Sequence, residues 1–146
     1  MSLLKEDFSL KKLEISDNVF RDLKTKGFSA IESFLDEDFA NELLKEVKSL
    51  HKNNLTRQAH IGSYKNRHIN KDIRGDKIYW LDWKSKIQRE YFNFLQNYIK
   101  RLNREFFLGI NGFEAHYAVY EEGSFYKKHF DNFKGENSRV VTILFY

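Results

Sequence analysis

Apolar residues recur at helical spacing in two stretches of the chain. The first stretch follows Asp36, a residue type that caps helix N-termini well, and its apolar positions are Phe39, Leu43, Leu44, Val47 and Leu50. The second stretch has apolar positions at Ile87, Tyr91, Phe94, Leu95, Tyr98 and Leu102. The spacing predicts amphipathic helices over residues 37–52 and 84–104.

Short aromatic and β-branched runs, separated by turn residues, follow the pattern that is typical of strands. These runs cover residues 27–35, 77–81, 113–120, 125–131 and 139–146. Residues 1–26 are polar and charged and predict an amphipathic or loosely packed lead-in, whereas residues 53–76 predict a long loop. Helices followed by an antiparallel sheet indicate an α+β fold in which the helices buttress one side of the sheet.

Composition narrows the classes of protein that fit. A chain of 146 residues, 41% hydrophobic, predicts a single domain with a real core. The absence of Cys excludes a disulfide framework, a thiolate metal site and a Cys nucleophile, and it fits a cytoplasmic setting. The N-terminal residues have no apolar run, so we expect no signal peptide and no membrane span.

Charge gives little support to nucleic-acid binding. The 25 basic and 21 acidic residues are interspersed, as on an ordinary solvated surface. The basic and aromatic stretch at residues 97–107 has the spacing of an amphipathic helix with a solvated basic face. A nucleic-acid partner is therefore not expected.

The candidate chemistry centres on His129-Phe130-Asp131. In a strand, residues i and i+2 point the same way, so the imidazole and the carboxylate would share one face. One imidazole nitrogen and one carboxylate oxygen are two of the three ligands in the facial triad that holds non-haem Fe(II). The alternative is a surface strand that carries two polar side chains.

A longer pattern surrounds this motif: IRGDKIYWL at Ile73–Leu81, YAVYEEGSFYKKHFDN at Tyr117–Asn132 and RVVTILFY at Arg139–Tyr146. Over these segments the chain resembles the Fe(II)- and 2-oxoglutarate-dependent oxygenases of the prolyl hydroxylase group. The resemblance implies a double-stranded β-helix (jelly-roll), with residues 1–112 as helical and strand support and residues 113–146 as the start of the jelly-roll core. It also implies a dioxygenase that hydroxylates a prolyl residue of a protein or peptide.

The resemblance further implies roles for individual residues. Fe(II) would be bound by His129 and Asp131, and no catalytic residue beyond these metal ligands is assigned. The cosubstrate 2-oxoglutarate would be contacted by Tyr120, Thr142 and Tyr146. The substrate would be contacted by Arg74, Asp76, Tyr126 and Arg139. Tyr120 and Tyr126 could instead pack in the core, and Tyr146 could be only an aromatic terminal residue. The charged residues could be solvated without any partner.

A long-range ion pair is a further hypothesis from the same segments. An Asp76–Arg139 pair would lock the loop of residues 53–76 over the site. Any of His60, His68 and His116 could supply a missing metal ligand, although each fits an ordinary polar role as well.

In the resembled family, a second His ligand and a basic residue for 2-oxoglutarate lie beyond the position of Tyr146. The sequence therefore predicts an incomplete site, and residues 1–146 alone are expected to turn over little 2-oxoglutarate. A fragment, a truncated or split product, and a chain whose jelly-roll another chain completes are the three explanations. A non-catalytic, jelly-roll-like binding or interaction module is the alternative function.

Overall fold

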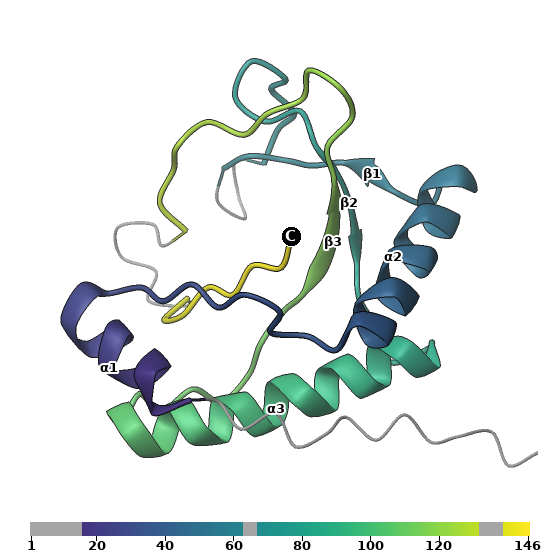
Figure 1. Ribbon diagram of the computed structural model, residues 1–146. Coiled ribbons are helices and arrows are strands. Elements are labelled where there is room, and N and C mark those ends of the chain that lie inside the picture. Colours follow the sequence, from purple (N-terminus) through teal and green to yellow (C-terminus); the bar gives the residue numbers. More distant parts are fainter. Residues whose placement is uncertain (1–15, 63–66, 132–138) are drawn as a thin grey trace, which may run out of the picture.

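The computed structural model describes residues 16–62, 67–131 and 139–146, so residues 1–15 of the predicted lead-in lie outside the described residues. Within the described part, two helices are followed by two strands, a third helix and a third strand (Figure 1). Their order is α1 (Asp17–Lys26), α2 (Glu37–Lys52), β1 (Arg57–Gln58), β2 (Lys77–Trp80), α3 (Lys86–Phe106) and β3 (His116–Val119). None of the described helices is long and apolar enough to cross a membrane.

The two predicted helices are confirmed. α2 has the predicted bounds, and the Asp36 carboxylate accepts hydrogen bonds from the backbone N–H of Asp38 and Phe39 at 3.1 and 3.4 Å. α3 is shifted two residues toward the C-terminus relative to the prediction, because Ser85 is its N-cap and accepts a hydrogen bond from the N–H of Gln88. Local capping therefore sets where both helices begin.

Helix α1 lies in the segment that was predicted to be a lead-in. It buries Val19 and Phe20 against Tyr98 and Leu102 of α3. Gly27 ends α1 with a φ of 79°, in the left-handed region where glycine is favoured. The lead-in is thus amphipathic and well packed over its described part.

The sheet has the order β1-β2-β3 and is antiparallel throughout. In the β2–β3 pair, Tyr79 lies opposite Tyr117 and Trp80 lies opposite His116. Cross-strand partners share a face, so Tyr79 and Tyr117 lie on one side of the sheet and Trp80 and His116 on the other. Figure 1 shows α2 on one side of the sheet and the C-terminal segment, in yellow, on the other.

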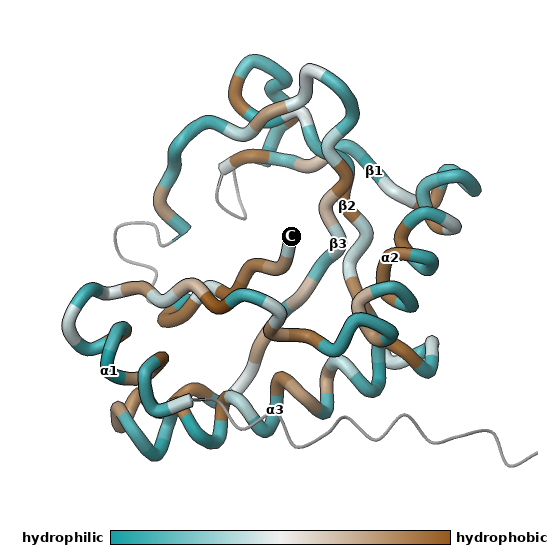
Figure 2. The backbone as a smooth tube through the Cα atoms, viewed as in Figure 1, coloured by the Kyte–Doolittle hydropathy of each residue, from teal (hydrophilic) through white to brown (hydrophobic). Residues whose placement is uncertain are grey.

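The hydrophobic core has two clusters, and both are built on α3. One buries Val19, Phe20, Tyr98 and Leu102, and the other buries Phe39, Tyr91, Phe92, Phe94 and Leu95. Hydrophobic positions of α2 and α3 face inward (Figure 2). Ile143 packs against both clusters, which ties the C-terminal segment to the helices.

Three predicted strands are wrong. Residues 27–35 contain turns, residues 125–131 contribute only a bridge from Tyr126 to Arg74, and residues 139–146 form no strand. A strand needs a neighbour that pairs over several residues, and the described residues provide none beside 127–131 or 139–146. The described part therefore confirms helices on an antiparallel sheet but not the predicted first half of a jelly-roll.

In the C-terminal segment, residues 139–146, the side chains of 140–144 alternate between exposed and half-buried positions although the segment forms no strand. Val141 and Ile143 pack against the helical core, whereas Val140 and Leu144 are exposed. This arrangement keeps Thr142 on the outward side with Leu144, where it reaches Asp131. The alternation thus positions a polar side chain at the candidate site.

Candidate functional site

His129 and Asp131 come together as the sequence predicted, although no strand holds them. The His129 Nε2 atom lies 3.2 Å from the Asp131 Oδ1 atom. On the other side of the ring, Nδ1 lies 2.9 Å from the backbone oxygen of Lys127. A carbonyl oxygen only accepts hydrogen bonds, so Nδ1 is the donor in this contact, and Nε2 is the nitrogen that faces Asp131.

The contact between the two side chains has a consequence for charge. The Nε2 nitrogen of His129 and the Oδ1 carboxylate oxygen of Asp131 lie 3.2 Å apart, so a single cation can be shared between the two atoms. Such an arrangement is favourable when a proton or a metal cation is shared between them. Imidazole nitrogen and carboxylate oxygen are also the donor types that suit Fe(II). His129 and Asp131 therefore fit two positions of a metal site.

Asp131 is anchored on its second oxygen. The Thr142 hydroxyl donates a hydrogen bond of 2.6 Å to Oδ2, and Arg139 Nη1 donates one of 3.4 Å to the Asp131 backbone oxygen. The Oδ1 atom is left to face His129. Thr142, which was predicted to contact 2-oxoglutarate, thus has a carboxylate partner in this structure.

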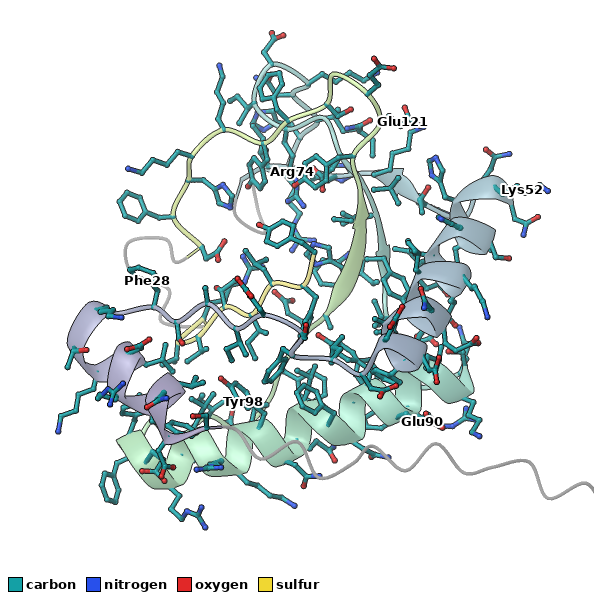
Figure 3. All side chains as sticks on the ribbon, in the orientation of Figure 1. Phe28, Lys52, Arg74, Glu90, Tyr98 and Glu121 are labelled. Carbon is teal, nitrogen blue, oxygen red and sulfur yellow. The ribbon has the colours of Figure 1, made fainter. Side chains whose placement is uncertain are left out.

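The His129 ring contacts Tyr126, which in turn contacts Arg74, the ion-pair partner of Asp76. The rings of Tyr126 and His129 stack with centroids 3.7 Å apart and an interplanar angle of 15°. The Arg74 guanidinium carbon lies 4.5 Å from the Tyr126 ring centroid. Figure 3 shows Arg74 among loop side chains, at the end of the sheet away from α3.

Arg74 and Asp76 form a buried, bidentate ion pair. Arg74 Nε and Nη2 donate to the two carboxylate oxygens at 2.7 and 2.9 Å, and the Asp76 side chain is 0% exposed. Burial acts against the charge of Arg74, but the hydrogen bonds to Asp76 outweigh it and raise the pKa of Arg74 above its ordinary value. Arg74 therefore stays ionised at neutral pH.

The hypothesised Asp76–Arg139 ion pair is wrong. Asp76 pairs with Arg74, and Arg139 pairs with Glu114 through Nε at 3.0 Å and Nη2 at 2.5 Å. Residues i and i+2 are already close in an extended chain, so the Arg74–Asp76 pair needs no long loop to close. Arg139 and Glu114 are both largely exposed, which leaves that pair weak.

Tyr120 and Tyr146, predicted for the cosubstrate, lie near one another. Burial, then the negative charge of Asp76, raises the pKa of Tyr120 above its ordinary value, and Tyr146 is close enough to add to the rise. Tyr120 is half exposed and Tyr146 fully exposed. Their contact with 2-oxoglutarate stays a prediction.

The three other candidate histidines do not join His129 and Asp131. His116 packs its ring against Trp80 at 4.9 Å, and this desolvation, then the charge of Arg74, lowers its pKa. The backbone oxygens of His60 and His68 are used in local hydrogen bonds. Across residues 16–62, 67–131 and 139–146, no group of three or more His, Cys, Asp or Glu side chains could hold a metal ion.

Two contributors to the site were not predicted. The backbone oxygen of Lys127 orients His129, and the Glu114 carboxylate holds Arg139. Every residue has a backbone oxygen, so the sequence does not show which of them accepts a hydrogen bond from a side chain. Glu114 is one of many acidic residues, and only the fold shows that it lies beside Arg139.

Comparison with known proteins relates the chain to a class of enzymes, which is consistent with the approach of His129 to Asp131. In sequence and in fold, the chain is related to the prolyl hydroxylases of the 2-oxoglutarate oxygenase type. No protein-family model matches the chain.

Two relatives carry this relationship. A hypoxia-inducible factor prolyl hydroxylase from Caenorhabditis elegans is 28% identical over 143 residues, which cover 90% of this chain and 20% of that protein. The crystal structure of a Pseudomonas putida prolyl-4-hydroxylase matches with a TM-score of 0.72 and 29% identity, over 80% of this chain and 60% of that one. The chain thus spans a fifth of the curated relative and three fifths of the solved one.

Proposed function

We propose that this chain carries part of the metal site of an Fe(II)- and 2-oxoglutarate-dependent dioxygenase that hydroxylates a prolyl residue of a protein or peptide. The observation that carries the proposal is the 3.2 Å approach of His129 Nε2 to Asp131 Oδ1, with each side chain fixed through its other polar atom. The relationship to prolyl hydroxylases supports the class of reaction.

Each site residue has a distinct task in this proposal. His129 and Asp131 hold the metal, and Thr142 fixes the Asp131 carboxylate so that Oδ1 stays turned toward it. Tyr120 and Tyr146 offer phenol groups to the cosubstrate. When bound, Fe(II) and 2-oxoglutarate supply the activation of O2 that hydroxylation of an unreactive C–H bond requires. The protein contributes binding, orientation and exclusion of water.

The residues predicted to contact the substrate differ in how much of the side chain is exposed. Asp76 has no exposed side-chain surface, so it can act on a substrate only through Arg74. Arg139 has a side chain that is 42% exposed and lies at the backbone of Asp131. We therefore assign Arg139 to direct contact with the substrate, and the half-buried Tyr126 stays a predicted contact.

Metal titration tests the proposal. Co(II), a spectroscopic substitute for Fe(II), is titrated into the wild-type chain, His129→Ala and Asp131→Ala, with binding followed by calorimetry and visible absorption. We expect each substitution to weaken binding by about tenfold or more, since even the loss of an outer partner of a metal ligand costs about that much. His60→Ala is the matched control. Equal binding by all four proteins would refute the metal site.

The alternative is a non-catalytic, jelly-roll-like binding or interaction module. The observation in its favour is that the described residues offer two metal ligands and not three. Because residues 1–146 alone are expected to turn over little 2-oxoglutarate, the metal dependence of binding to a proline-containing peptide separates the two functions. Peptide binding that needs Co(II) and that His129→Ala weakens supports the enzyme site, whereas peptide binding with no need for metal supports the module.

A further inference from the structure

We propose that Arg74 and Tyr126 are positioning residues that set the orientation of the His129 imidazole. Three planar groups, the guanidinium, the phenol ring and the imidazole, lie in one stack. The inference rests on the proposed function in that His129 is taken to be a metal ligand.

The order of the stack follows from the distances. The His129 ring lies nearly parallel to the Tyr126 ring at 3.7 Å, which fills that face of the phenol. A guanidinium at 4.5 Å from the same ring centroid has no room on the filled face. Arg74 must therefore cover the opposite face, and Tyr126 lies between Arg74 and His129.

The base of the stack is rigid. The wholly buried Asp76 carboxylate accepts two hydrogen bonds from Arg74, and these fix the plane of the guanidinium. The backbones are joined as well, because Gly75 N–H donates to the Phe125 oxygen at 2.8 Å and Lys127 N–H donates to the Ile73 oxygen at 2.9 Å. Backbone hydrogen bonds thus join the loop before β2 to the segment that carries His129.

Two constraints then act on His129. Stacking on Tyr126 fixes the plane of the imidazole but allows the ring to turn over within that plane. The hydrogen bond from Nδ1 to the Lys127 oxygen selects one of the two ring orientations. Together they direct Nε2 at Asp131 Oδ1, which is the geometry a metal ion needs.

The test uses a graded set of variants. Tyr126→Phe keeps the stack, Tyr126→Leu removes the aromatic face, and Arg74→Lys keeps the charge but loses the planar fork. Arg101→Lys is the matched control, because Arg101 lies 4.6 Å over the Phe20 ring and pairs with Asp17 at 2.8 Å, remote from His129. Thermal unfolding of each variant shows whether it folds.

The first readout needs no metal. Long-range proton–nitrogen NMR of the imidazole reports which nitrogen carries the proton, and we expect the Nδ1-protonated form in the wild type, Tyr126→Phe and Arg101→Lys. Tyr126→Leu and Arg74→Lys are expected to show a mixture of the two tautomers, because the ring is no longer held flat against its support. Should Tyr126→Leu fail to fold, Arg74→Lys decides the question.

The second readout is the dissociation constant for Co(II). We expect about a tenfold loss for Tyr126→Leu and a change within about twofold for Tyr126→Phe and Arg101→Lys. A folded Tyr126→Leu with the wild-type tautomer and affinity would overturn the positioning role, as would a loss in Tyr126→Phe equal to that in Tyr126→Leu. Absence of Co(II) binding by the wild type would refute the proposed function alone, because the tautomer readout still tests the stack.

Discussion

Substitution of Asp76 by Ala tests how strongly the buried ion pair supports the fold. Asp76 is 0% exposed and accepts two hydrogen bonds from Arg74, whose side chain is 14% exposed. The substitution leaves a guanidinium without its counter-charge in a site that water barely reaches. The backbone bonds at Asp76, to Ala59 and to the Gln58 side chain, are retained.

The magnitude follows from burial. Removing one partner of a buried ion pair costs about 3–5 kcal/mol, because the remaining charge is left desolvated and unpaired. The low end, about 3 kcal/mol, applies here because Arg74 keeps some access to water and can turn toward it. Asp76→Asn keeps one acceptor oxygen for Arg74, so we expect about half that loss.

Urea denaturation followed by circular dichroism measures the change in the free energy of unfolding. Asp17→Ala is the matched control, since Asp17 also pairs with an arginine, at 2.8 Å, but its side chain is 96% exposed. We expect the control to cost less than about 1 kcal/mol. A loss for Asp76→Ala as small as that of the control, at an unchanged urea dependence, would refute the argument from burial.

The remaining predictions concern other contacts of the site and its support. Burial, then the hydrogen bond to the Glu46 carboxylate, raises the pKa of Tyr117, so the unfolded chain loses this proton first as pH rises above about 10. The free energy of unfolding should therefore fall in that range, and less steeply in Tyr117→Phe, as measured by urea titrations from neutral to alkaline pH. Thr142→Val should weaken Co(II) binding about tenfold while Thr142→Ser keeps it, because only the hydroxyl holds Asp131. A double-mutant cycle between Asp76 and Arg139 should give no coupling beyond about 0.5 kcal/mol, since each has another partner.

Helices were the most predictable part of the fold. The bounds of α2 follow from apolar spacing and the Asp36 cap, both of which are local signals. α1 was missed as a helix because its apolar positions are few, and its stability depends on burial against α3, which the sequence does not display. Local chemistry therefore predicts an element well only when that element does not depend on a distant partner.

Strands and side-chain partners were harder for the same reason. Residues 139–146 alternate as a strand would, yet a strand also needs a neighbour to pair with, and alternation carries no information about one. The approach of His129 to Asp131 was predictable from their spacing, whereas the stack behind His129 and the exchange of partners between Arg74 and Arg139 were not. Proximity in sequence can be read directly, but proximity in space depends on the whole fold.

The bridge between Arg74 and Tyr126 closes a loop of about fifty residues that contains the whole of α3. The β2–β3 pairing closes most of the same loop, so the support for His129 is built on the sheet and on the packed helix. A peptide of residues 113–146 would contain His129 and Asp131 but would lack Arg74 and the packed helix. If His129 and Asp131 bind a metal as proposed, that binding depends on the assembled core, and we expect a peptide of residues 113–146 to bind no Co(II) in a calorimetric titration.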